Sequence, residues 1–158
     1  MDKEEFEKTI EKLNNRIVNL ECQIKNLKDK GKEYTPMKGE EYDYIDLDTM
    51  TIEIGDWDGY VDDITRKKNR IIFDTEEKAN EYLEYLLEKR KHMNIFTDEE
   101  WKDTSIMKFY YFYNEEKKIV TNHLYGMRMA VPYFRTEEET EDFIQAYAWA
   151  IKYELGVN

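Results

Sequence analysis

At the N-terminus, apolar residues recur at alternating intervals of four and three, and this regularity constrains the chain more than any other feature. The residues that carry it are Phe6, Ile10, Leu13, Ile17, Leu20, Ile24 and Leu27. Such a series is typical of the a and d positions of a heptad repeat, where two helices bury one narrow seam. Isoleucine at a with leucine at d favours a parallel two-stranded coiled coil. We therefore predict a dimerisation helix over about residues 6–27.

The alternative is that this stripe packs on the globular part of the same chain. A strict a/d stripe is narrower than the face that such a helix usually buries, which favours self-association. Gly31 is expected to end the helix, and the following residues contain Pro36 and Gly39, which are typical of a linker. The predicted organisation is a coiled-coil helix at 1–31, a linker at 32–41 and a globular domain at 42–158.

Beyond the linker the apolar period changes to two, which is typical of half-buried strands. Thr75 and Thr136 are each followed by glutamates, a pattern that predicts helix N-caps. The expected elements are strands at 42–47, 51–57 and 70–73, a loop at 58–69, a helix to about 92, strands at 107–113, 118–125 and 127–134, and a helix to about 155. The predicted fold class is α+β, with antiparallel sheet in two β-meander-plus-helix units at about 42–92 and 105–156.

The formal net charge is −12, and its distribution indicates what kind of partner the chain binds. Residues 1–33 hold eight acidic and eight basic residues, whereas residues 40–63 hold ten carboxylates and no Lys or Arg. Such segregated charge repels bare nucleic acid and anionic membranes and attracts a basic partner. The predicted partner-binding residues are Glu40, Glu41, Asp43, Asp46, Asp48, Glu53, Asp56, Trp57, Asp58, Tyr60, Asp62 and Asp63.

The sequence contains no recognisable catalytic, nucleotide-binding or zinc-binding motif. It has one cysteine and two histidines, in no zinc-ligand spacing. The run from Asp56 to Asp63 departs from the EF-hand order, because position 12 is Lys67 instead of Glu. A solvated acidic loop is therefore favoured over a divalent-cation site. We predict no enzyme activity, no cofactor and no metal.

The single cysteine, the lack of a long apolar run and the charged start Met-Asp-Lys-Glu-Glu predict a cytoplasmic protein without a membrane segment. The aromatic run Phe109–Tyr113 has the composition of a base-stacking platform. Few basic residues surround it, however, and strand alternation directs at least one of its faces into the core. Direct binding of nucleic acid is therefore not expected.

Two stretches, Trp57–Ala79 and Tyr133–Val157, share Phe-x-Thr-Glu-Glu at a helix start, and the second closes in Leu-Gly-Val. Together with the heptad-bearing helix, this arrangement resembles a group of small proteins encoded by phages and prophages of Firmicutes. The chain departs from that group at Arg70-Ile71-Ile72, where Gly-Asn is typical. Some small prophage proteins of this kind inhibit host defence systems, including CRISPR nucleases.

The resemblance and the acidic segment together predict a non-enzymatic, anti-CRISPR-type inhibitor. It would act in the cytoplasm of an infected bacterial host, where its carboxylates would imitate nucleic acid in the basic groove of a defence nuclease. One alternative is a coiled-coil scaffold or regulatory adaptor of a phage. A nucleic-acid-binding protein is the less favoured alternative.

Overall fold

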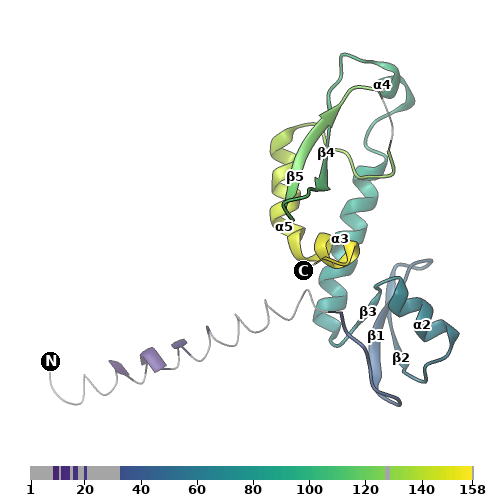
Figure 1. Cartoon of the computed structure of the whole chain (residues 1–158), viewed down its shortest axis with the longest axis vertical. Coiled ribbons are helices and arrows are strands. Elements are labelled where there is room, and N and C mark those ends of the chain that lie inside the picture. Colours follow the sequence, from purple (N-terminus) through teal and green to yellow (C-terminus); the bar gives the residue numbers. More distant parts are fainter. Residues whose placement is uncertain are drawn as a thin grey trace.

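The computed structural model describes residues 9–10, 12–14, 16–17, 20, 33–126 and 129–157, and it is a mixed α+β structure with two small antiparallel sheets (Figure 1). In chain order the elements are β1 (Glu41–Asp46), β2 (Thr51–Asp56), α2 (Val61–Lys68), β3 (Ile72–Phe73), α3 (Glu76–Met93), α4 (Asp98–Lys102), β4 (Lys108–Tyr113), β5 (Ile119–Leu124) and α5 (Glu137–Leu155). The α+β class is therefore confirmed for the globular part of the chain.

In each hairpin the first strand also pairs with a later segment of the chain. In the first sheet the order is β2-β1-β3, so that Tyr44 of β1 lies opposite Glu53 on one side and Ile72 on the other. In the second sheet β4 pairs with β5 and forms an isolated bridge from Phe109 to Phe134. A β-meander would put the second strand in the centre, so the predicted strand order is wrong. In the first sheet, the segment that contains α2 carries the chain back to the free side of β1.

The prediction of a loop at 58–69 is wrong, because helix α2 occupies most of this segment. Two features favour this helix: carboxylates in its first turn and three basic residues in its last turn, both of which complement the helix dipole. This helix does not bury its apolar side chains, since Val61 and Ile64 are 77% and 55% exposed. The side chain that α2 buries is instead that of Asp63.

The strand predicted at 127–134 is also not formed by its described residues, 129–134. They contribute the single bridge at Phe134, while the amide of Tyr133 donates to the carbonyl of His92 at 3.1 Å. Pro132 has no N–H with which to extend a ladder. The sequence-based prediction lacks the short helix α4, whose N-cap, Thr97, forms a capping box with Glu100.

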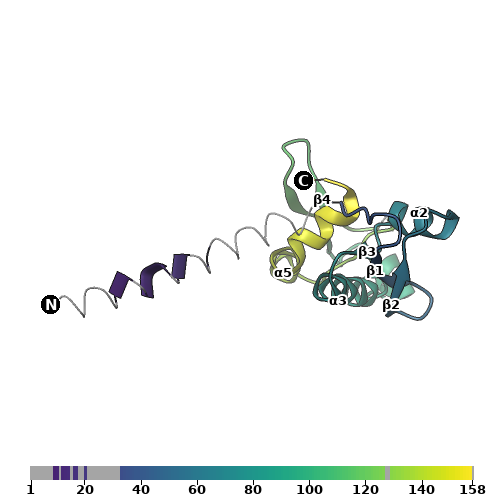
Figure 2. The ribbon, with the colours of Figure 1, turned by 90° about the horizontal axis from the view of Figure 1, so that it is seen from below.

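Helix α3 follows the first sheet in the chain and packs between that sheet and helix α5. It packs on the first sheet, where α2 covers the opposite side of β1, and it also contacts α5 (Figures 1 and 2). Helix α5 in turn packs on β4 and β5. The buried side chains between these elements are mainly aromatic and include Phe73, Tyr82, Tyr85, Tyr111, Phe134, Phe143 and Tyr153. Their hydroxyl groups find partners, for example Glu154 for Tyr85 at 2.6 Å and the carbonyl of Ile72 for Tyr153 at 3.1 Å.

Helix α5 begins and ends as the sequence predicts but bends in between. Thr136 caps its N-terminus and Gly156, with φ of 70°, ends it in the left-handed conformation. At Tyr147 the backbone is not helical (φ −122°, ψ 19°), and the two halves run in different directions (Figure 1). No Pro or Gly lies between residues 137 and 155 to cause this bend.

The coiled coil remains a prediction. Of its seven residues, Phe6, Ile24 and Leu27 lie outside the described part of the chain. Ile10, Leu13, Ile17 and Leu20 are in helical conformation and are 42–54% exposed. Within the described residues, no helix combines the length and the apolar character that crossing a membrane requires.

Candidate partner-binding surface

Strand alternation divides the acidic segment between the two faces of the first sheet. Glu41 and Asp43 lie four and two residues before Ile45 of the core, so they share its face of β1, on which α3 packs. Asp56 pairs with Glu41 and lies on the same face. Asp46 and Glu53 lie on the opposite face, which α2 partly covers. The predicted carboxylates therefore do not form one continuous face.

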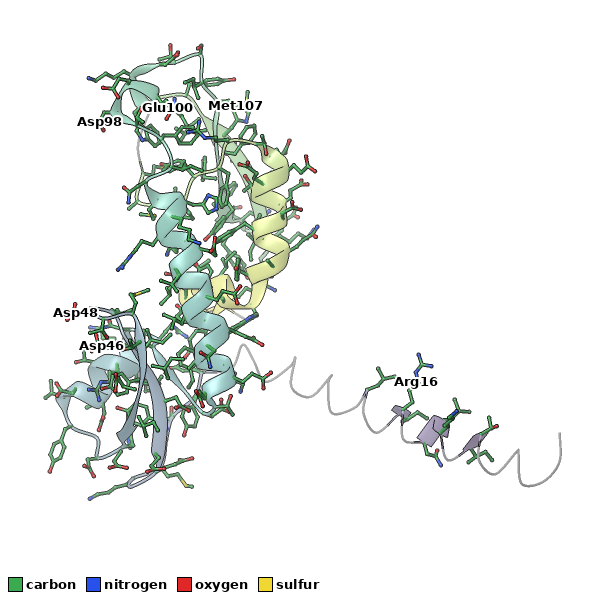
Figure 3. The ribbon with its side chains drawn as sticks, turned by 180° about the vertical axis from the view of Figure 1, so that it is seen from behind. Arg16, Asp46, Asp48, Asp98, Glu100 and Met107 are labelled. Atoms are coloured by element: carbon green, nitrogen blue, oxygen red, sulfur yellow. The ribbon has the colours of Figure 1, made fainter. Side chains whose placement is uncertain are left out.

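A groove between the turn end of the β1–β2 hairpin and α2 brings one subset together. Its lining residues are Tyr44, Ile45, Asp46, Leu47, Asp48, Asp62, Thr65, Arg66, Asn69 and Ile71. Figure 3 shows Asp46 and Asp48 close together at this end of the hairpin. Asp48 and Asp62 are exposed, and Asp46 is half-buried. The groove therefore presents carboxylates from both a strand and a helix.

Asp46 is held in position by the turn that it stabilises. Its carboxylate accepts the amide N–H groups of Asp48 at 2.8 Å and Thr49 at 3.2 Å. These backbone hydrogen bonds hold the pKa of Asp46 below its ordinary value. The carboxylate is therefore charged at neutral pH and has a fixed orientation.

Among the described residues that line the groove, Arg66 is the one Lys or Arg, and it is turned toward the protein. Its Nη1 donates to the hydroxyl of Tyr42 at 3.0 Å and lies 3.7 Å from Oδ1 of Asp63. Its guanidinium lies 3.8 Å from the ring centroid of Tyr44, within cation–π distance. Arg66 is thus engaged with the sheet, and its charge pairs with Asp63 beneath the groove.

Asp63, one of the predicted partner-binding residues, is buried and has a structural role. It is 5% exposed and accepts the hydroxyl of Tyr42 at 2.6 Å and the amides of Asp58 and Gly59 at 2.9 and 3.0 Å. Burial raises the pKa of Asp63, but the hydrogen bonds from Tyr42 and from these amides outweigh it and lower the pKa overall. Both carboxylate oxygens are committed inside the protein, so Asp63 is not accessible to a partner or to a cation.

The other predicted residues surround this framework. Glu40 is half-buried and accepts the amide of Met37 at 2.7 Å, and Trp57 packs edge-on against Tyr42 with ring centroids 5.9 Å apart. Tyr60, at the start of α2, is 73% exposed. The carboxylates exposed to solvent are Glu41, Asp48, Glu53, Asp56, Asp58 and Asp62.

On the α3 face the acidic surface continues onto residues that the sequence analysis missed. Burial raises the pKa of Asp43, and the neighbouring carboxylates of Glu76 and Glu41 raise it further. A shallow hollow on α3 continues the negative charge; its lining residues are Glu76, Glu77, Asn80, Glu81 and Glu84. These residues recur at helical spacing on one side of α3, a signal that was present in the sequence.

In the described part of the chain, no three His, Cys, Asp or Glu residues are grouped so that they could hold a metal ion. Comparisons with protein-family models, curated proteins and solved structures returned no match.

Proposed function

We propose that this protein is a non-enzymatic phage protein that binds a basic surface of a host protein. In its sharpest form the proposal is an anti-CRISPR-type inhibitor, acting in the cytoplasm of the infected host on the nucleic-acid groove of a defence nuclease. One observation carries it. Asp46, Asp48 and Asp62 line a groove whose arginine is engaged inward with the sheet.

Charge of this kind acts mainly on encounter and specificity. Exposed carboxylates attract a basic partner from a distance and repel acidic competitors. The apolar contact that retains a partner would come from the neighbouring start of α2, where Tyr60, Val61 and Ile64 are 73%, 77% and 55% exposed. Aromatic and aliphatic side chains at the centre of an interface typically supply most of its binding energy.

The test is a pull-down from bacterial host lysate with the full-length protein as bait, followed by a nuclease assay on the captured protein. The decisive variant combines Asp48→Asn, Asp58→Asn and Asp62→Asn, which removes three exposed charges and spares Asp63. The matched control combines Glu115→Gln, Glu138→Gln and Glu141→Gln, which removes three exposed charges elsewhere. We expect capture and inhibition to be lost in the first variant and kept in the control. Equal capture by both variants would refute the role of the exposed carboxylates in the groove (Asp48, Asp62) and beside it (Asp58).

The exposed heptad residues favour a second candidate, a coiled-coil scaffold. Ile10, Leu13, Ile17 and Leu20 lie on a helical segment, and roughly half of each side chain faces solvent. A chain with Ile17→Lys and Leu20→Lys tests this in sedimentation and pull-down experiments. The scaffold hypothesis predicts complete loss of function, whereas the inhibitor hypothesis predicts weaker, monovalent binding.

A further inference from the structure

A second groove, between α3 and α5, combines acidic and aromatic side chains. Its lining residues are Glu81 and Glu84 from α3 and Ala146, Tyr147 and Trp149 from α5. Residues three apart on a helix lie on the same side, so the two glutamates form one wall. The two aromatic side chains and the alanine form the other.

The bend in α5 shapes the aromatic wall. At Tyr147, where the helix bends, the ring packs on Phe143 and Tyr85, with centroids 4.9 and 5.8 Å away. Trp149 packs on Tyr82, with centroids 6.0 Å apart. Both side chains are half-buried. The core therefore fixes these rings from within and leaves their outer parts to line the groove.

The groove also holds a carboxylate that is exposed to solvent, that of Glu84. The hydroxyl of Tyr147 donates to Oε1 of Glu84 at 3.3 Å. Burial, and then the charges of Glu84 and Glu88, raise the pKa of Tyr147, so the hydroxyl remains a donor at neutral pH. None of the described residues that line the groove is Lys or Arg. On α3, the ammonium of Lys89 is paired with Glu154 at 2.5 Å, outside the groove.

We propose that this groove binds an arginine side chain of a protein partner. Charge complementarity with the exposed carboxylate of Glu84 selects a cation. The flat rings select a guanidinium over an ammonium, since a planar guanidinium can stack on an aromatic face while its N–H groups bond carboxylates. The inference rests on the proposed function in one respect, because a basic partner supplies the arginine. The arginine site between α3 and α5 would give the partner a second contact, separate from the groove beside α2.

The experiment uses the full-length protein and N-acetyl-arginine amide as probe, observed through the indole N–H signals of the three tryptophans. A Trp149→Phe variant assigns the relevant signal. We expect the Trp149 signal to shift with a dissociation constant in the millimolar range, while the Trp57 and Trp101 signals stay in place. N-acetyl-citrulline amide, which has nearly the same shape but no charge, should produce no saturable shift, and N-acetyl-lysine amide should bind more weakly.

Two matched double variants locate the site. Glu81→Gln with Glu84→Gln should weaken arginine binding by about tenfold, the equivalent of about 1.4 kcal/mol. Glu76→Gln with Glu77→Gln removes the same charge from the same helix outside this groove and should leave binding within about twofold of the unmodified protein. Equal effects of the two variants, equal binding of citrulline or lysine amide, or no shift at Trp149 would overturn the inference.

These outcomes are separable from failure of the proposed function. If arginine amide does not bind but the lysate partner is still captured through Asp48, Asp58 and Asp62, the inference fails and the proposed function stands. If arginine amide binds as expected but no lysate partner depends on those three aspartates, the groove is an arginine site and the proposed function fails.

Discussion

The buried carboxylate of Asp63 offers the sharpest test of how α2 is held beside the groove. Its hydrogen bonds to Tyr42, Asp58 and Gly59 are all 3.0 Å or shorter. Asparagine at this position retains one acceptor oxygen for the two amides. Its NH₂ group, however, faces the Tyr42 hydroxyl, which already accepts a hydrogen bond from Arg66. The substitution therefore removes a charge-assisted bond and leaves the O–H of Tyr42 without its acceptor.

A hydrogen bond to a charged group contributes about 1.5–3 kcal/mol. We expect Asp63→Asn to lower the free energy of unfolding by about 2–3 kcal/mol, since it removes one such bond and the charge beside Arg66. For a chain of this size that corresponds to a fall in Tm of roughly 5–10 °C. Urea denaturation followed by far-UV circular dichroism measures the difference, and the midpoint should move at constant slope.

The neighbouring substitution Asp62→Asn is the control. Asp62 is exposed and lines the groove, so its removal should change the free energy of unfolding by less than about 0.5 kcal/mol. If Asp63→Asn were no more destabilising than this control, the network of Tyr42, Asp63 and Arg66 would not be what holds α2 in place.

The difference in free energy of unfolding between the unmodified protein and Asp63→Asn should depend on pH in one direction. The pKa of folded Asp63 lies below its ordinary value of 3.8, so the unfolded chain takes up the proton first as the pH falls. Stability from this carboxylate is therefore full above the unfolded pKa and disappears as the pH falls through the folded one. The gap between the unmodified protein and Asp63→Asn should be constant near neutral pH and shrink below about pH 4. A gap that widened in acid would contradict the assignment.

Two further substitutions test the packing around each sheet by urea denaturation. Gly55→Ala should cost about 1–3 kcal/mol by overpacking, because the new Cβ would lie 3.0 Å from Cζ of Tyr42; a neutral result would show that the ring can move away. Lys108→Met should cost about 1–3 kcal/mol, because it leaves the carbonyls of Asp103, Ile106 and Tyr125, which accept from the buried ammonium at 2.9–3.1 Å, without this donor. A loss below about 1 kcal/mol would show that water satisfies these carbonyls instead.

The sequence predicted those elements whose signals are local. The period-two pattern located β1, β2, β4 and β5 to within two residues, and Thr75 and Thr136 located the starts of α3 and α5. These signals work because alternation and capping depend on neighbouring residues alone.

The errors have a common physical cause, which is dependence on distant contacts. Helix α2 buries a charged side chain and exposes apolar ones. Asp63 is buried against Tyr42, 21 residues away in the sequence, whereas Val61 and Ile64 are exposed. The bend at Tyr147 likewise has no local breaker and coincides with packing on Tyr85 of α3. In the acidic segment, composition predicted the charge correctly, but only the strand register showed which carboxylates lie together.

The placement of the basic side chains determines how salt affects stability and binding. There are 24 basic and 36 acidic residues, and several of the basic ones are engaged internally: Arg66 with Tyr42, Lys108 with carbonyls and Lys89 with Glu154. Such contacts are short and partly shielded, so salt screens them weakly, whereas exposed carboxylates act over the Debye length of about 10 Å at 0.1 M.

Raising the ionic strength from about 0.05 M to about 0.5 M should therefore slow association with a basic partner by at least about tenfold. The midpoint of urea unfolding should stay the same or rise, because screening also relieves repulsion among the exposed carboxylates. Stopped-flow association and urea titration at matched salt concentrations measure the two effects. Association that was insensitive to salt would refute charge as the basis of recognition, and unfolding that became easier would show that surface ion pairs hold the fold.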